Sequence, residues 1–436
     1  MWAYETVFYQ IYPLGFCGAP FENDGIMTHR LRKIEEWIPH MKKLGIGGIY
    51  LSPVFESDTH GYNTRDYKKV DCRLGDNEDL RHLVKLLHES GIRVLLDGVF
   101  NHVGRGFFGF QDVLKKREHS PYLSWFHIAL DGNSCYNDGL WYEGWEGNYD
   151  LVKLNLHNPA VVDYLIACVK YWIDEFDIDG LRLDVAYCLT DEFVYRLRNE
   201  CDRFKQDFFL VGEMLHGDYN QKMREGMLHS VTNYECYKGL HSSFNSMNLF
   251  EINHSLLRQF GPENWTLYRG KHLWNFVDNH DVTRVASILN NPRHLPLIYG
   301  LMFGMPGIPC IYYGSEWGTK ADKTQGDPAL RASFETPQWN ELTDTIAKLS
   351  QLKFSQDALN YGSFRSVVLT NKQCIFERKT DRERILVAIN ADESDYMAYF
   401  DAGCASAIDL ITNTSHEFAG GSMLPAYSMQ YWKMER

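Results

Sequence analysis

The 436-residue sequence has no apolar run long enough to span a bilayer, and it is short of positive charge. Its 57 aspartates and glutamates outnumber its 44 lysines and arginines, which gives a formal net charge of −13. A protein of this balance is poorly suited to nucleic acid or to an anionic membrane surface. We therefore expect no nucleic-acid partner, no membrane partner, and action on a neutral molecule.

The N-terminus also lacks the basic segment and apolar stretch of a secretory signal. The ten cysteines include no Cys-x-x-Cys pair and no spacing typical of a disulfide framework. This predicts free, mostly buried thiols in a reducing compartment. We expect a cytoplasmic protein, or a secreted one if a leader was removed.

Internal repeats and low-complexity tracts are absent as well, and what recurs is an apolar strand followed by a helical pattern. The pattern predicts helices that include 31–44, 79–90 and 342–352, and a helix that begins at Pro159 after an Asn158 N-cap. Eight strand-helix units in this order predict an α/β protein with a (β/α)8 TIM barrel. The expected strands are residues 6–11, 46–51, 92–97, 180–184, 208–213, 231–234, 273–277 and 308–313.

Two segments depart from this alternation. Residues 103–150 contain 11 aromatic residues without a clear period, which predicts an inserted lobe after the third strand. We expect Trp125, Trp141 and Trp145 to form the core of that lobe. From residue 356 to 436, short strands separated by turns predict a C-terminal antiparallel β-sandwich domain. The barrel then comprises residues 1–102 and 151–355.

Carboxylates stand at the ends of several predicted barrel strands, where barrel enzymes build their active sites. Asp97, Asp184, Glu213 and Asp281 follow the third, fourth, fifth and seventh strands, with His102 and His280 close by. Asp184 and Glu213 lie 29 residues apart, about one strand-helix unit of ~30 residues. We therefore expect these side chains to ring one mouth of the barrel.

Arg182 and Asp184 point to the same face of the fourth strand, because strand residues two apart share a face. One interpretation is a structural ion pair. The other is that Arg182 keeps Asp184 ionised as a nucleophile, while burial raises the pKa of Glu213 so that it serves as an acid. Paired carboxylates in these roles perform glycoside hydrolysis. A metal-dependent barrel hydrolase is the alternative, although the predicted strand ends carry no His-x-His pair.

Four segments in this order resemble the signature regions of the α-amylase family of glycoside hydrolases: Asp97–His102, Gly180–Asp184, Val211–Glu213 and Phe276–Asp281. Gly307–Glu316 is similar to the family's eighth-strand motif, and His60–Tyr62 resembles the segment whose tyrosine stacks under the sugar. The resemblance implies a retaining mechanism with Asp184 as nucleophile, Glu213 as acid/base and Asp281 as transition-state stabiliser. It also implies substrate-binding roles for Tyr62, Asp97, His102, Arg182 and His280.

Within the family, Leu151–Asn155 looks closest to the neopullulanase, cyclomaltodextrinase and maltogenic amylase group. Asp327 and Arg331 resemble that group's donor-side sugar-binding segment, although a surface ion pair would give the same pattern. The group's extra N-terminal domain is expected to be missing, because the first strand starts almost at Met1. Many relatives bind calcium, and Asn101 is a candidate ligand, but Cys188 stands where they have a better one.

The resemblance thus implies an enzyme that cleaves α-1,4 bonds of maltooligosaccharides or soluble starch, as a monomer or homodimer, with no cofactor except calcium as a possible structural ion. Alternatives in the same family are a transglycosylase and an enzyme acting on α-1,6 bonds or cyclodextrins. A non-catalytic glycan-binding relative would not need the complete set of Asp184, Glu213 and Asp281.

Overall fold

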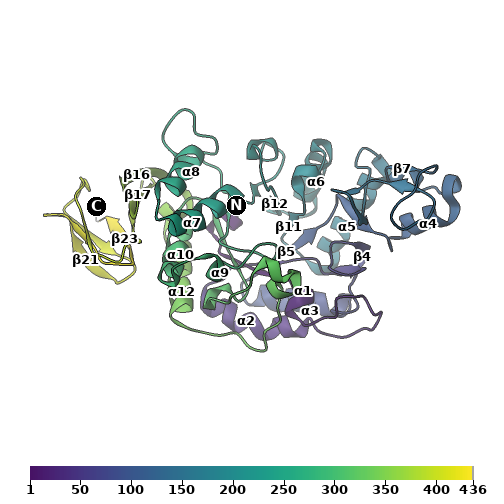
Figure 1. Cartoon of the computed structure of the whole chain (residues 1–436), viewed down its shortest axis with the longest axis horizontal. Helices are drawn as coiled ribbons and strands as arrows, with labels where there is room; N and C mark the ends of the chain where they lie inside the picture. The colour runs from purple at the N-terminus through teal and green to yellow at the C-terminus, as the bar shows by residue number, and fades with distance from the viewer. Residues whose placement is uncertain (435–436) are drawn as a thin grey trace.

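The molecule has three parts along its long axis: a C-terminal β-domain, a central barrel and a lobe (Figure 1). The structure is a computed structural model that describes residues 1–434. The C-terminal β-domain lies at one end, the barrel is central, and the lobe with α4 (Phe108–Lys116) lies at the other end. No helix in residues 1–434 combines the length and the apolar character that crossing a bilayer requires.

The predicted barrel is confirmed. Its strands are parallel neighbours in chain order, and the circle closes through a parallel bridge between Thr232 and Trp274. The sixth and seventh strands are only two residues long, shorter than predicted, because the chain turns away into α7 (Tyr234–Ser246) and into the polar loop after Asn275. The strands are β1 (Phe8–Ile11), β2 (Gly48–Leu51), β5 (Arg93–Gly98), β11 (Gly180–Leu183), β12 (Phe209–Gly212), β13 (Ser230–Val231), β14 (Trp274–Asn275) and β15 (Ile308–Tyr312).

Helices surround the barrel, and their ends follow the capping signals in the sequence. Gly45 takes the left-handed conformation (φ 81°) that ends the first long helix, and Asn158 accepts a hydrogen bond from the backbone of Ala160 ahead of Pro159. The principal helices are α2 (Arg32–Leu44), α3 (Asn77–Glu89), α5 (Pro159–Phe176), α6 (Asp191–Phe204), α7, α8 (Phe250–Phe260), α10 (Leu295–Gly304) and α12 (Glu341–Ser355).

Apolar side chains fill the barrel and the layer outside it. Inside, the buried residues Phe8, Leu95, Phe209, Trp274 and Ile308 pack together in one apolar core. A second, larger cluster joins the outer faces of the strands to the helices. This two-layered core makes the strands rigid, so that residues at their carboxyl ends have fixed positions.

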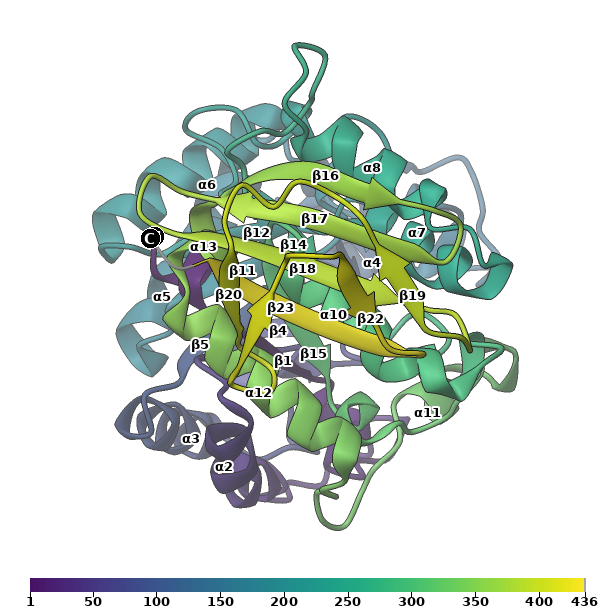
Figure 2. The ribbon, with the colours of Figure 1, turned by 90° about the vertical axis from the view of Figure 1, so that its left-hand side faces the viewer.

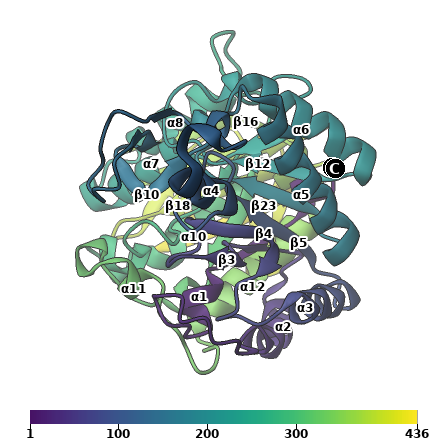
Figure 3. The ribbon, with the colours of Figure 1, turned by 90° about the vertical axis from the view of Figure 1, so that its right-hand side faces the viewer.

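The lobe is built on a three-stranded sheet of β6 (His102–Gly104), β10 (Asn148–Lys153) and β9 (Gly144–Trp145) and faces the viewer in Figure 3. Because β10 pairs with β6 as far as Lys153, the lobe's sheet extends from 102 to 153, slightly beyond the predicted 103–150. Trp125 is buried as expected. The prediction is wrong for Trp141, which is 41% exposed, and for Trp145, which is half-buried; two-residue strands leave too little sheet to cover them.

The C-terminal domain is an antiparallel sandwich, as predicted (Figure 2). One face of its large sheet packs on α10, where Arg378 donates to the carbonyl of Gly304 at 2.7 Å. The large sheet has the order β16 (Ser363–Leu369), β17 (Gln373–Lys379), β18 (Arg384–Asn390), β23 (Ser428–Met434), β20 (Ser406–Asp409) and β21 (Thr414–Glu417), and the small sheet pairs β19 (Tyr396–Ala398) with β22 (Ser422–Leu424). All ten cysteines are free, and seven are buried.

Candidate active site

A cavity of about 480 Å³ opens at the carboxyl ends of the barrel strands, beside the lobe. It brings together seven of the residues that the sequence singled out: Tyr62, His102, Asp184, Glu213, Asp281, Asp327 and Arg331. Three others, Asp97, Arg182 and His280, lie behind this lining and contact it through hydrogen bonds and ion pairs. The expected constellation is therefore one site.

Arg182 on β11 is the centre of this site. Its Nη1 donates to Asp184 Oδ1 at 2.7 Å and to Asp97 Oδ1 at 3.0 Å, and its Nη2 lies 2.7 Å from Glu213 Oε1. All four residues are at most 6% exposed. One buried guanidinium therefore fixes the positions of three buried carboxyl groups.

Because Arg182 is shared among three carboxyl groups, it affects the pKa of Asp184 less than a dedicated partner would. Burial raises the pKa of Asp184 well above its usual value, even though Arg182 opposes the shift, because Glu213 and Asp97 add negative charge nearby. Burial likewise raises the pKa of Glu213, again against Arg182 and with help from Asp281. Arg182 favours the ionised form of Asp184, as predicted, but burial and the two neighbouring carboxyl groups act in the opposite direction. Because Asp97, Asp184 and Glu213 share one cation, protonation of one carboxyl group favours the charged form of its neighbour.

Val185 follows the proposed nucleophile and links it to the proposed acid. Its backbone N–H donates to Glu213 Oε2 at 2.9 Å. To do so, the residue adopts a left-handed backbone conformation (φ 39°), which is unfavourable for a β-branched side chain. The strained backbone of Val185 thus helps to orient the carboxyl group of Glu213.

Asp281 is held from two sides. His280 Nε2 lies 3.1 Å from Asp281 Oδ2, and Arg331 Nη2 lies 2.9 Å from Oδ1. Burial opposes the charged form, but His280, Arg331 and Arg182 outweigh it and lower the pKa of Asp281 to about 2. Asp281 is therefore a permanent negative charge at neutral pH, suited to stabilising a positive transition state.

His280 is positioned by the first barrel strand. The amide of Gln10 on β1 lies 2.8 Å from His280 Nδ1, which leaves the ring proton on Nε2, facing Tyr62 and Asp281. Burial lowers the pKa of His280 to about 3, so the ring is neutral. Tyr62 also donates to Asp97 Oδ2 at 3.2 Å, which joins this group to Arg182.

His102 presents an unsatisfied nitrogen to the cavity. Asn101 Nδ2 lies 3.2 Å from His102 Nδ1, which places the ring proton on Nε2. Nε2 has no hydrogen-bond partner among the described residues and is 3.8 Å from Asp184 Oδ2. Burial lowers the pKa of this ring to about 3. A neutral donor of this kind suits a sugar hydroxyl.

Asp327 and Arg331 both line the cavity, so they are more than a surface ion pair. Arg331 Nη2 lies 3.0 Å from Asp327 Oδ2 and, at 2.9 Å, contacts Asp281 as well. The sequence did not reveal this second contact, because the two residues are separated by 50 positions and no local pattern connects them.

Several residues that line the active-site cavity had no role assigned to them from the sequence. His60 Nε2 lies 3.6 Å from Asp150 Oδ2 on β10 of the lobe, and both residues line the cavity. Trp145, Tyr187, Leu215 and Tyr234 also line this cavity. His60 belongs to the segment His60–Tyr62, Asp150 directly precedes Leu151–Asn155, and Leu215 is two residues after Glu213, so these three had a sequence signal close by.

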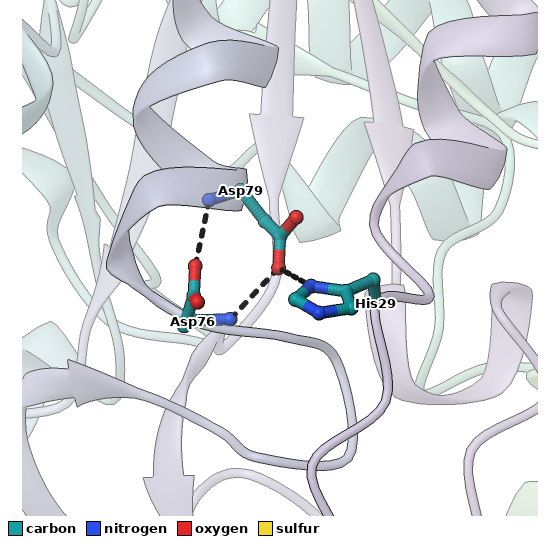
Figure 4. A group of neighbouring side chains, drawn as sticks. All are labelled: His29, Asp76 and Asp79. Carbon is teal, nitrogen blue, oxygen red and sulfur yellow. Dashed lines mark hydrogen bonds and ion pairs between the residues drawn. The ribbon is translucent and has the colours of Figure 1, made fainter.

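Two groups of described residues have the spacing of a metal site, but neither includes a residue that lines the cavity. In the first, Asp76 and Asp79 form the capping box that begins α3, and His29 hydrogen-bonds to Asp79 (Figure 4). In the second, Asp71 is paired with Arg73, and Glu56 lies 3.4 Å from Lys69. Both sets of oxygens therefore already have partners.

Asn101, the predicted calcium ligand, is buried and already has hydrogen-bond partners. Its backbone carbonyl accepts from Leu154, and its amide faces His102. Cys188 offers a thiol, which is a poor ligand for a hard cation. This donor set does not fit calcium.

The family model and the most similar known proteins agree on one family for most of the chain. The family described as "Alpha amylase, catalytic domain" matches residues 10–357. A maltogenic α-amylase of Bacillus acidopullulyticus is 33% identical over 437 residues, covering 92% of this chain and 72% of that protein. A cyclomaltodextrinase of a Bacillus species is 31% identical, covering 91% and 74%.

Among solved structures, a debranching enzyme of Nostoc punctiforme superimposes with a TM-score of 0.84 at 28% identity. The superposition covers 99% of each chain. The similarity therefore includes the barrel, the lobe and the C-terminal domain.

Proposed function

The chain belongs to the α-amylase family of glycoside hydrolases, and we propose that it cleaves α-1,4 bonds of maltooligosaccharides or soluble starch with retention of configuration. The observation that carries the retaining mechanism is the contact of Arg182 with both Asp184 and Glu213, 2.7 Å from each. One guanidinium can hold two carboxyl groups only if they are close together. Retaining glycosidases have their two carboxyl groups about 5–5.5 Å apart, whereas inverting enzymes leave room for a water molecule between them.

In the first step, the carboxylate of Asp184 attacks the anomeric carbon, and Glu213 gives its proton to the glycosidic oxygen as that bond breaks. The product is a glycosyl ester of Asp184 and a free sugar hydroxyl. In the second step, Glu213 takes a proton from water, the water oxygen attacks the anomeric carbon, and Asp184 leaves as a carboxylate.

The other cavity residues have supporting roles in this proposal. The positive charge that develops on the sugar ring is stabilised by the permanently ionised Asp281. His102 donates to a sugar hydroxyl through its free Nε2, and the ring of Tyr62 forms an apolar surface for the reacting sugar. Asp97, Arg182 and His280 hold these groups in place from behind.

Action on cyclodextrins or α-1,6 bonds, or glycosyl transfer, is the second candidate. It is favoured by the apolar wall of Trp145, Leu151 and Leu215, because apolar contacts accept differently linked or cyclic acceptors more readily than hydrogen bonds do. Two of the similar proteins are named a cyclomaltodextrinase and a debranching enzyme.

The test is product analysis on maltotriose, maltoheptaose, pullulan and β-cyclodextrin side by side, with Asp184→Asn as the inactive control. Release of shorter maltooligosaccharides from maltoheptaose supports the proposal. Cleavage of only pullulan or β-cyclodextrin favours the second candidate, and products longer than the substrate indicate transfer. Substantial turnover by Asp184→Asn would refute the assigned nucleophile.

We further propose that the enzyme needs no cofactor and works in the cytoplasm as a monomer or homodimer. The poor calcium donor set at Asn101 and the ten free thiols support this. Dialysis against a chelator should leave kcat unchanged, and light scattering should give a mass of one or two chains.

A further inference from the structure

Arg284 is a fully buried arginine that does not line the active-site cavity. The hydrogen bonds of its guanidinium go to three neutral oxygens: the backbone carbonyls of Tyr313 at 2.8 Å and Leu330 at 3.0 Å, and Ser315 Oγ at 3.0 Å. A buried cation with neutral partners is costly, and only the planar fork of an arginine can reach several oxygens in different directions. The segments that Arg284 joins indicate what it does.

The first of these segments carries Arg331. The carbonyl of Leu330, the residue before it, accepts a second hydrogen bond from the hydroxyl of Tyr312 on β15 at 2.9 Å. The guanidinium of Arg284 lies 4.5 Å from the centre of the Tyr312 ring, so the two donors also contact each other. A side chain at Gly15 would lie 2.0 Å from the carbonyl oxygen of Arg331. The backbone of Arg331 is therefore held tightly on both sides.

The second segment is the polar loop of residues 278–284, which follows β14 and carries Asp281. At its start, Asp278 Oδ2 accepts hydrogen bonds from the backbone N–H of Val285 and from Ser315 Oγ, both at 2.8 Å. At its end, Arg284 Nη1 donates to the same Ser315 Oγ. Both ends of the loop are thus tied to Ser315, just after β15.

The two segments meet in the active site. Arg331 Nη2 lies 2.9 Å from Asp281 Oδ1, and Arg331 Nε donates to the carbonyl of His280 at 3.2 Å. Arg331 is one of the groups that lower the pKa of Asp281, so the place of its guanidinium affects how strongly Asp281 is held ionised. Arg284 anchors both partners of this contact from outside the cavity.

We propose that Arg284, together with Tyr312, is a positioning residue for the proposed transition-state stabiliser: it fixes the backbone of Arg331 so that the Arg331 guanidinium meets Asp281. This inference rests on the proposed function. Without these anchors Arg331 withdraws from Asp281, and the chemical step slows while the sugar-binding surface remains. The effect therefore falls on kcat rather than on KM.

The first test is Tyr312→Phe, which removes one buried hydroxyl and no packing surface. On maltoheptaose we expect kcat to fall by about threefold to tenfold, the range of one lost hydrogen bond, with KM within about twofold of the wild type. The matched control is Tyr299→Phe, because Tyr299 on α10 is equally buried but its hydroxyl has no hydrogen-bond partner among the described residues. It should match the wild type.

The second test removes the anchor itself. Arg284→Met should lower kcat by about 10- to 100-fold, because one charged donor to the Leu330 carbonyl and the tie to Ser315 are lost together. Arg284→Lys should recover only part of this loss, since an ammonium group cannot reach both oxygens as the fork does. Full recovery by Arg284→Lys would contradict the two-segment anchor. Should Arg284→Met not fold, Tyr312→Phe still tests the inference.

An Arg331→Met background separates positioning from a purely structural role. With the Arg331 guanidinium gone, Tyr312→Phe has nothing left to position and should change kcat by less than about twofold. The same loss of kcat in both backgrounds, together with a lower urea midpoint, would show a structural role and overturn the inference. So would a Tyr312→Phe enzyme that is as active as Tyr299→Phe.

If the wild-type enzyme hydrolyses no maltooligosaccharide, the proposed function fails. The positioning role is then judged from a crystal structure of Arg284→Met, or of Tyr312→Phe if the former does not fold. Movement of Arg331 Nη2 beyond hydrogen-bond distance of Asp281 Oδ1 supports the inference, and an unchanged contact of 2.9 Å refutes it.

Discussion

Arg182 on β11 contacts Glu213 at the end of β12, with Nη2 2.7 Å from Oε1. The same side chain contacts Asp184 and Asp97 through Nη1. The two proposed catalytic carboxyl groups are therefore positioned by a single buried cation, and both their geometry and their protonation depend on it.

Replacing Arg182 should destabilise the fold as well as abolish activity. Arg182→Met leaves three buried carboxyl groups without their cation, and breaking a buried ion pair costs about 3–5 kcal/mol. Urea denaturation should show this loss at pH 8, and a smaller loss at pH 5, because protonation of the carboxyl groups relieves their repulsion. Arg203→Met, at a 73% exposed side chain, is the control. Equal stability of the two variants would contradict this view of the site.

Arg331 should act through Asp281. Arg331→Met removes the 2.9 Å contact that helps keep Asp281 ionised, and we expect kcat/KM to fall by about 10- to 100-fold, the range of one charged hydrogen bond. In an Asp281→Asn background the same change should cost much less, which a double-mutant cycle measures. Additive losses would show that Arg331 has a separate role. Arg196→Met, which breaks an exposed ion pair with Asp163 away from the cavity, is the control.

The pH profile should reveal Glu213 as the acid. Burial raises its pKa, so the acid stays protonated at higher pH than an ordinary glutamate, and kcat/KM falls once the pH passes that pKa. With a 4-nitrophenyl α-maltoside, whose leaving group needs no proton, Glu213→Gln should keep most of its kcat/KM and lose the alkaline limb. On maltoheptaose it should lose roughly 10²- to 10⁴-fold. An alkaline limb that persists in Glu213→Gln would assign it to another group.

Buried His102 should make the fold sensitive to acid. Its folded-state pKa is about 3, below the value of ~6.5 in an unfolded chain. As the pH falls through ~6.5, the unfolded chain gains a proton that the folded ring does not, so the free energy of unfolding falls by up to about 1.4 kcal/mol per pH unit until the pH nears 3.

The variant His102→Gln should therefore show a shallower decrease in stability between pH 6.5 and 4.5 than the wild type, measured from urea midpoints at half-unit steps. His119→Gln, at an 84% exposed side chain, serves as the control. If His102→Gln keeps the wild-type slope, the ring is not the buried neutral group described here.

The barrel and the catalytic carboxylates could be predicted because each depends on local sequence. An apolar run that ends on a polar residue identifies both a buried strand and its carboxyl end, where barrel enzymes place their active sites. Asp97, Asp184 and Glu213 were found in this way. The sharing of Arg182 among three carboxyl groups could not be predicted, since it depends on the register of β5, β11 and β12. The contact of Arg331 with Asp281 joins residues 50 positions apart, and no periodic pattern in the sequence indicates such a pair.

The lobe was the least predictable part. Apart from β10, its strands have only two or three residues and are too short to show alternation. No pattern in the sequence therefore distinguished the buried Trp125 from Trp145, which lines the cavity. That difference arises only when the lobe docks on the barrel.

The central claim is that Asp184 forms a covalent intermediate next to the acid Glu213, and the anomeric configuration of the first product tests it most directly. Maltoheptaose is mixed with enzyme at a concentration that completes cleavage within minutes, and proton NMR follows the anomeric signals before mutarotation. The account predicts that the newly formed reducing end appears first as the α-anomer and that the β-anomer grows in afterwards. Initial release of the β-anomer would mean a single displacement by water and would contradict the proposed role of Asp184.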